Sequence, residues 1–204
     1  MHVKSHRIMN VSTPDHINLF TKFKEGDDHA FAFFYELYIN DLYTYGISLG
    51  GEKEVVKDVI QDIFLKIYFE KKDFASTDHL KYFLLKSLKN SLYNIYKSKA
   101  VATTTGISEE VMAFSITTTV LDRIIDEEDR AIIKQQIDDL LSKLTSRQKE
   151  AIYLRFMQEL EYDDIAEIMD MTPHAARKLI SRSLKRLKDS ELLLFMYLSV
   201  LFFS

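Results

Sequence analysis

The chain has 204 residues, enough for one large or two small domains. Its 5 glycines, 2 prolines and lack of cysteine favour helices and exclude disulfides, thiolate zinc sites and cysteine nucleophiles. The formal charge of −4 at pH 7 argues against DNA binding by bulk attraction, so a DNA-binding surface must be a local concentration of lysine and arginine.

The N-terminal half is expected to form a helical domain. Residues 1–14 lack the apolar core of a signal peptide, so we expect a disordered tail and a cytoplasmic protein. The domain covers residues 15–99. Its first helix spans residues 15–24, and Asp28 is expected to cap a second helix that ends at Leu49. This second helix carries more aromatic residues than one apolar stripe needs, so many of them must be buried between helices.

The third expected helix, residues 52–70, has two unlike sides. Its core side consists of Val56, Val59, Ile60, Ile63 and Ile67. Its opposite side presents Asp58, Gln61, Asp62 and Leu65. This mixture is compatible with a solvated face or with a docking surface for a basic partner, and spacing alone does not decide between them.

The fourth expected helix, residues 78–99, is basic. Its cations are Lys81, Lys86, Lys89, Lys97 and Lys99, and no acid follows Asp78. Interleaved with them are Tyr82, Phe83, Tyr93, Tyr96, Asn90 and Asn94. Lysines beside flat rings and amides are typical of a surface that binds single-stranded nucleic acid, while the same rings also suit a core.

A linker and a second domain follow. Residues 100–120 contain two runs of three threonines and little periodicity, which indicates a flexible linker. Helical periodicity resumes at Leu121, and the second domain is expected over residues 121–190. Inside it, Thr145 and Gln148 match a capping box that starts another helix. The residues expected to close its core are Ile152, Leu154, Phe156 and Met157.

The end of this domain predicts a helix-turn-helix. Residues 162–170 form a short helix with Ile165, Ile168 and Met169 on one side. Thr172 is a suitable N-cap for a next helix that runs to Lys188, and Pro173 fits its first position. The apolar stripe of that helix is Ala176, Ile180, Leu184 and Leu187. The rest of it is basic, and two helices joined by so short a turn place the second in the major groove of DNA.

The expected fold is therefore all-α, with two small helical domains joined by a flexible linker. Residues 191–204 add an almost wholly apolar tail. As a helix this tail reaches only about 20 Å, against a hydrocarbon thickness of about 30 Å, so a full membrane span is not expected. Three alternatives stay open: packing onto its own domains, burial by an inhibitory protein, or shallow or indirect membrane contact.

Five segments carry a resemblance to a known family. They are Phe34–Tyr38, Asp58–Lys66, Leu88–Asn94, Leu144–Glu150 and Tyr162–Ile168. Together they resemble the extracytoplasmic-function group of bacterial RNA polymerase sigma factors, of the sigma-70 family, especially those common in Bacteroidetes. The resemblance implies that the first domain is like sigma region 2 and the second like sigma region 4. The chain departs from the family at Asp170, which replaces a turn glycine, at Leu179, which replaces a polar residue, and at Asn94, which replaces a frequent Asp.

The resemblance also implies roles for particular residues. It implies a sigma factor that binds core RNA polymerase, recognises promoter −10 and −35 elements, and has an anti-sigma factor as a further partner. The polymerase-binding residues are then Asp58, Gln61, Asp62, Leu65 and Lys66. The residues for −10 DNA are Lys86, Lys89, Asn90, Tyr93, Asn94 and Lys97. The residues for −35 DNA are Thr172, His174, Ala175, Arg177, Lys178, Ser181, Arg182 and Lys185.

The main competing function is a stand-alone helix-turn-helix regulator that binds duplex operator DNA. An enzyme is not expected, because the chain has no Gly-rich phosphate loop, no HExxH pair and no nucleophile with a nearby base. The six histidines are scattered along the chain, so neither a metal site nor a cofactor is expected.

Overall fold

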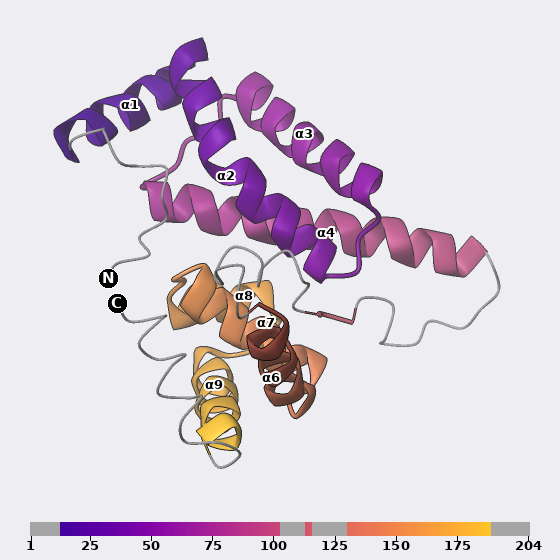
Figure 1. Ribbon diagram of the computed structural model, residues 1–204. Coiled ribbons are helices and arrows are strands. Elements are labelled where there is room, and N and C mark those ends of the chain that lie inside the picture. The colour runs from indigo at the N-terminus through magenta and orange to yellow at the C-terminus, as the bar shows by residue number, and fades with distance from the viewer. Residues whose placement is uncertain (1–12, 103–112, 116–129, 189–204) are drawn as a thin grey trace. The chain divides into compact units, whose positions relative to one another are not determined.

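A computed structural model of the chain describes residues 13–102, 113–115 and 130–188 (Figure 1). The chain divides into two compact units, one made mainly of residues 4–112 and the other mainly of residues 113–204. Every secondary-structure element in the described residues is a helix, which confirms the expected all-α class. Most of the predicted N-terminal tail and linker, the start of the second domain and the apolar tail lie outside the described residues. Among the helices described, none is long and apolar enough to cross a membrane.

The described residues of the N-terminal unit form four helices. They are α1 (Thr13–Glu25), α2 (Asp28–Ser48), α3 (Lys53–Glu70) and α4 (Thr77–Ala102). Aromatic rings from several of these helices make up much of the core: Phe23 of α1 meets Phe34 of α2 with ring centroids 5.0 Å apart. Phe31 of α2 meets Phe64 of α3 at 5.9 Å. The aromatic surplus of α2 is thus used to pack α2 against its neighbours, as the sequence predicts.

The cap of α2 differs from the sequence prediction. The backbone N–H of Ala30 donates to Asp27 Oδ1 at 2.8 Å, so Asp27 caps the helix. Asp28 lies inside the first turn, and its Oδ1 accepts a hydrogen bond from the Tyr68 hydroxyl at 2.9 Å. The prediction was wrong by one residue because Asp27 and Asp28 are adjacent and equally suitable caps by type.

Glycine lets α2 and α3 approach closely. A Cβ atom added to Gly46 would come within 2.6 Å of Val56 Cγ1, and one added to Gly51 within 2.5 Å of Val56 Cγ2. Val56 is fully buried. The missing side chains therefore set the position of α3 against the end of α2.

The described part of the C-terminal unit contains α6 (Arg130–Ser142), α7 (Ser146–Ile152), η2 (Tyr153–Met157), α8 (Tyr162–Ile168) and α9 (Pro173–Lys188). The predicted capping box is confirmed: Gln148 N–H donates to Thr145 Oγ1 at 3.3 Å, and Thr145 N–H donates to Gln148 Oε1 at 3.0 Å. Helix α9 packs against both α7 and α8.

A π-helical turn, η2, changes which side chains enter the core. Ile152 and Leu154 are buried as predicted, but Phe156 and Met157 are only half-buried. Tyr153 is buried in their place, and its hydroxyl accepts a hydrogen bond from Gln158 Nε2 at 3.0 Å. The wider turn rotates the residues after Tyr153 away from the positions that 3.6-residue periodicity predicts. Phe114 is also buried and lies 5.4 Å from the Tyr153 ring.

Candidate nucleic-acid interface

Several hydrogen bonds define the turn between α8 and α9. Asp170 has φ 51°, in the left-handed region, and the backbone N–H of Met171 donates to Ala166 O at 2.9 Å. This is the Schellman end of a helix, in which the left-handed residue is usually glycine. Arg147 of α7 donates from Nη2 to Met169 O at 2.7 Å, which satisfies a carbonyl at the end of α8 and ties α7 to the turn.

Thr172 then starts α9. The backbone N–H of Ala175 donates to Thr172 Oγ1 at 3.2 Å, and the N–H of Ala176 donates to Thr172 O at 3.0 Å. Pro173 occupies the first helical position, where its missing N–H costs nothing. The predicted cap and helix start are confirmed, so the chain leaves α8 and enters α9 in one defined direction.

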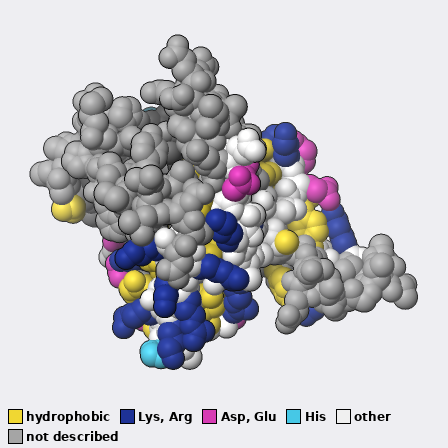
Figure 2. All heavy atoms as spheres, turned by 60° about the horizontal axis from the view of Figure 1, so that its bottom comes forward, with side chains coloured by type: hydrophobic (Ala, Val, Ile, Leu, Met, Phe, Trp, Pro, Cys, Tyr) yellow, Lys and Arg dark blue, Asp and Glu magenta, His cyan; other side chains and the backbone are white. Residues whose placement is uncertain are grey.

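Helix α9 separates a buried face from a cationic face. Ala176, Ile180, Ser183 and Leu187 are buried, and Leu184 is half-buried. Ser183 was not predicted to be buried; its hydroxyl donates to Leu179 O at 2.8 Å, which satisfies it inside the helix. Figure 2, which brings the bottom of Figure 1 forward, shows lysine and arginine side chains gathered on the α9 side of this unit.

Every residue predicted for −35 DNA lies on α9 or at its cap and is exposed. Consecutive residues of an α-helix are rotated by about 100°. On that basis His174, Lys178, Ser181 and Lys185 share one stripe, flanked by Arg177 and Arg182, opposite the buried face. Within the described residues Arg177, Lys178, Arg182 and Lys185 make no ion pair with an acid. Leu179 is half-buried, so it does not extend the exposed stripe.

The residues predicted for −10 DNA lie along one side of α4. Lys86, Asn90, Tyr93 and Lys97 share a stripe at helical spacing, and Lys89 and Asn94 flank it. Asn90, Asn94 and Lys97 are exposed, and 47% of Tyr93 is exposed, whereas Lys86 and Lys89 are half-buried. The exposed ring of Tyr93 is therefore next to two exposed amides.

Several lysines of α4 lie over tyrosine rings of the same helix. Lys97 Nζ is 5.8 Å from the centre of the Tyr93 ring. Lys86 Nζ is 5.2 Å from the Tyr82 ring and donates to its hydroxyl at 2.7 Å. Tyr96 has another role, because its hydroxyl accepts a hydrogen bond from Glu52 N–H, the N-cap of α3, at 2.8 Å. Tyr96 is thus a structural residue, while Tyr93 is available to a ligand.

The exposed face of α3 contains all five residues predicted to bind polymerase. Asp58, Gln61, Asp62, Leu65 and Lys66 are exposed, opposite the buried side of the helix. Lys66 lies 3.9 Å from Glu70. Asp58 and Asp62 form no ion pair within the described residues, so their charges are free to meet a basic partner.

The same face continues for one more turn, which the sequence analysis missed. Tyr68 and Phe69 follow Leu65 at helical spacing, and 38% of Tyr68 and 75% of Phe69 are exposed. The hydrogen bond to Asp28 fixes the Tyr68 ring and raises the pKa of its hydroxyl. The spacing 65, 68 and 69 was a usable signal, because three large apolar residues on one exposed side of a helix are unusual.

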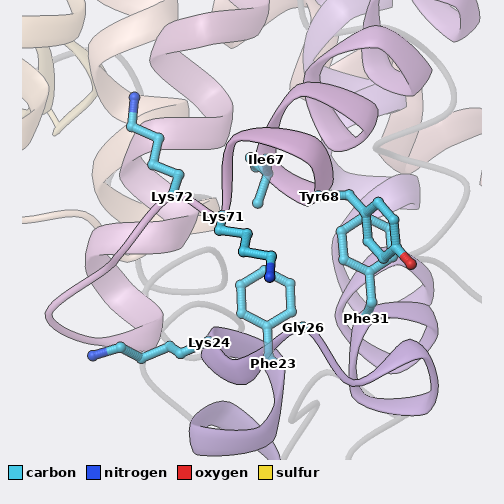
Figure 3. Close-up of a pocket in the computed structure, with 8 residues that line it drawn as sticks. All are labelled: Phe23, Lys24, Gly26, Phe31, Ile67, Tyr68, Lys71 and Lys72. Atoms are coloured by element: carbon cyan, nitrogen blue, oxygen red, sulfur yellow. The ribbon is translucent and has the colours of Figure 1, made fainter.

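A small hollow lies between α1, α2 and the end of α3 (Figure 3). Aromatic residues Phe23, Phe31 and Tyr68 line it, together with Lys24, Lys71 and Lys72. None of its lining residues is a histidine or an acid. In the part of the chain that the structure describes, no three His, Asp or Glu side chains are placed to hold a metal ion.

Comparison with known proteins gives a consistent picture. Residues 134–187, from within α6 to the last turn of α9, match the family described as Sigma-70, region 4. The chain is 24% identical over 156 residues to "ECF RNA polymerase sigma factor SigM" of Bacillus subtilis (strain 168), which covers 76% of this chain and 90% of that protein. It is 24% identical over 164 residues to "RNA polymerase sigma factor YlaC" of the same organism, covering 77% and 93%. It is also 22% identical over 167 residues to "Bacteriocin UviA" of Clostridium perfringens, covering 79% and 82%. Each of the three alignments with whole proteins is longer than either compact unit, so it extends into both.

Proposed function

We propose that this chain is an RNA polymerase sigma factor of the extracytoplasmic-function group, sigma-70 family. The observation that carries the proposal is the coincidence of the sigma-70 region 4 match, residues 134–187, with the folded helix-turn-helix unit. Similarity to two sigma factors over most of their length extends the argument to the N-terminal unit. A sigma factor works with core RNA polymerase, so we place the protein in the cytoplasm.

The exposed face of α3 is the proposed contact with core polymerase. Asp58 and Asp62 supply unpaired carboxylates, and Leu65 adds apolar area that a partner can cover. A basic surface on the polymerase would be attracted by the carboxylates, and burial of the apolar side chain would add affinity. The large exposed side chains Leu65, Tyr68 and Phe69 support docking over a merely solvated face, which would be polar.

The exposed face of α4 is the proposed contact with the melted −10 element. Tyr93 offers a ring on which an unstacked base can stack, and Asn90 and Asn94 offer amide donors and acceptors beside it. Lys86, Lys89 and Lys97 lie along the same side and would follow the phosphates of that strand. This combination suits single-stranded DNA better than duplex, because a base must leave its stack to reach the ring.

Helix α9 is the proposed reader of the −35 element as duplex DNA. Within the described residues Arg177, Lys178, Arg182 and Lys185 make no ion pair with an acid. The opposite face of α9 is buried, so the helix can enter a major groove while its unit stays folded. The proposed −35 contacts are the α9 and N-cap residues that the sequence predicts. The net charge of −4 is then not an obstacle, because promoter affinity belongs to the assembly with polymerase.

Reconstituted transcription tests the proposal. The chain mixed with core RNA polymerase is expected to initiate specifically from a subset of upstream fragments of its own genome. The double substitution Asp58→Lys with Asp62→Lys should abolish this initiation, because it reverses both charges that we assign to the polymerase contact. Glu25→Lys with Glu36→Lys, which reverses two exposed acids on α1 and α2, is the matched control and should initiate normally.

The outcomes separate the possible functions. Full initiation by the double variant would remove α3 as the polymerase contact. No initiation by the wild-type chain, together with tight binding of duplex DNA by the chain alone, would establish a stand-alone helix-turn-helix regulator instead.

Two finer proposals concern partners and subtype. An anti-sigma factor is proposed because the sequence of residues 192–204 is almost wholly apolar, and such a segment would invite aggregation if no partner covered it. These residues lie outside the described part of the chain. Deleting them should weaken inhibition or raise solubility, and a deletion without effect on either would remove the proposal. The Bacteroidetes type is supported by the motifs alone, since the relatives found come from Bacillus and Clostridium.

A further inference from the structure

Tyr162, the first residue of α8, lies beneath two arginines from different elements. The guanidinium carbon of Arg155, in η2, is 4.9 Å from the centre of the Tyr162 ring. The guanidinium carbon of Arg177, in α9, is also 4.9 Å from it. Both distances are within the range, up to about 6 Å, in which a cation is attracted to the face of an aromatic ring. One side chain therefore connects three elements of the C-terminal unit.

The two arginines are held in different ways. Arg155 Nη1 donates to the backbone oxygen of Leu160 at 2.7 Å and to Glu161 Oε1 at 3.2 Å, and its side chain is partly buried. These bonds fix Arg155 to the segment that enters α8. Arg177 is exposed. Within the described residues, its guanidinium interacts with the Tyr162 ring and with no other side chain. The ring is thus contacted by one arginine that is held by hydrogen bonds, Arg155, and by one that is exposed, Arg177.

An arginine that contacts a ring through the face of its guanidinium keeps its hydrogen-bonding capacity. A guanidinium group has five N–H donors, all in its plane, so contact through its face leaves those donors free for a phosphate or a base edge. An unrestrained arginine side chain samples many rotamers and loses that freedom when it binds. Arg177 lies in the first turns of α9, the part of a recognition helix that contacts base edges.

We propose that Tyr162 is a positioning residue for promoter binding, which stacks on Arg177 and holds its guanidinium ready for duplex DNA. Arg155, which is itself held by Leu160 O and Glu161, limits the movement of the ring. This inference rests on the proposed sigma-factor function and adds to it a residue outside α9 that controls what α9 presents. It differs from a purely structural role for Tyr162, because it requires the ring face and depends on Arg177.

The experiment measures promoter affinity of the chain assembled with core polymerase. Tyr162→Phe keeps the ring and should bind like the wild type. Tyr162→Leu removes the ring face and should weaken specific binding by about two- to fivefold, the range for an exposed cation–π contact. The same change in an Arg177→Ala background should have no further effect, because the two residues act through one contact. Binding to core polymerase should change in none of these variants. Binding to non-specific DNA should be equal among the chains that keep Arg177, whereas Arg177→Ala removes a cation and should weaken it in both backgrounds.

Fluorination keeps the test decisive if Tyr162→Leu fails to fold. Replacing Tyr162 by 3,4,5-trifluorophenylalanine keeps the size and packing of a ring while weakening the negative charge of its face. Specific binding should fall relative to Tyr162→Phe, which a merely structural ring would not do. Equal binding by the two ring variants, or equal losses with and without Arg177, would overturn the inference. Wild-type assembly without any promoter specificity would overturn both this inference and the proposed function, whereas a specific wild type with insensitive variants overturns this inference alone.

Discussion

Helices α4 and α9 both carry cations along one face, but they use them differently. On α9, Lys178, Arg182 and Lys185 are exposed and make no ion pair with an acid within the described residues. On α4, Lys86 and Lys97 lie over the rings of Tyr82 and Tyr93. Free cations act on phosphates at any sequence and are sensitive to salt, whereas rings with neighbouring lysines act on unstacked bases. The difference indicates that α9 suits duplex DNA and α4 suits a melted strand.

Removing charge from α9 should have the largest effect. The triple substitution Lys178→Ala, Arg182→Ala and Lys185→Ala should lower duplex promoter affinity on the order of 10²-fold near 0.2 M salt, since each lost phosphate contact removes about 0.9 from the slope of log K against log salt. The measurement is affinity for duplex DNA across a salt series, expected to lose about 2.7 from that slope.

The matched control for this test is the removal of exposed lysines elsewhere. Lys22, Lys53 and Lys71 lie on or at the ends of α1 and α3. Changing all three to alanine gives a control with the same net charge as the α9 variant. An equal loss in the control would mean that total charge matters and the α9 face does not.

Removing the exposed ring of α4 should have the next largest effect. Tyr93→Ala should weaken binding to a melted −10 strand by about 1–3 kcal/mol, the usual contribution of a base stacked on an aromatic ring. Its salt dependence should stay almost unchanged, because no positive charge is removed. Competition binding with single-stranded promoter DNA measures both quantities, with Tyr93→Phe as the ring-preserving control. A loss that low salt restores would contradict the contrast between the two helices.

The faces of α3 and α9 were predictable because both are regular helices. Their buried residues repeat at spacings of three and four, so periodicity alone separates Ile60 or Ile180 from the exposed acids and cations. The start of α9 was predictable for a related reason: the cap is a local feature, formed by Thr172 and the next three residues.

Other features depend on contacts that spacing does not encode. The π-helical turn begins at the buried Tyr153 and leaves Phe156 half-buried, because one wider turn changes the register of the residues after Tyr153. Asp27 and Asp28 are equivalent as caps until the path of the chain and the Tyr68 hydroxyl select between them. Likewise, the two arginines over Tyr162 are 22 residues apart in sequence, and only the folded unit brings them to one ring.

Helix α9 can present its cations to duplex DNA only while it keeps its orientation within the C-terminal unit. Its N-cap, Thr172, helps to hold that orientation. Thr172→Ala removes the acceptor for Ala175 N–H and should lower the free energy of unfolding by about 1 kcal/mol. Thr172→Ser keeps the hydroxyl and should retain most of the stability. Urea unfolding of the full chain, followed by circular dichroism, measures both variants without DNA. Equal stability of the alanine and serine variants would show that the cap is dispensable.

Asp170 in the turn before α9 should give the smallest effect, with the opposite sign. Its φ of 51° lies in the left-handed region, which costs most residues about 1–2 kcal/mol, Asp less and glycine nothing. Its carboxylate also lies at the C-terminal end of α8, where the helix dipole disfavours negative charge. Glycine removes both penalties but makes the unfolded chain more flexible, so Asp170→Gly should stabilise the chain by only about 0.5 kcal/mol.

Two controls separate these contributions at Asp170. Asp170→Asn keeps the tolerance for positive φ and removes the charge, so a gain shared by Asn and Gly reports the helix dipole. Asp170→Ala keeps the left-handed backbone strain but has no polar side chain. In the same urea experiment it should lower the free energy of unfolding by about 1 kcal/mol. If alanine were as stable as glycine, the left-handed conformation would not be what limits this turn. The orientation of α9 would then depend mainly on the Thr172 cap and on the Arg147 bond to Met169 O.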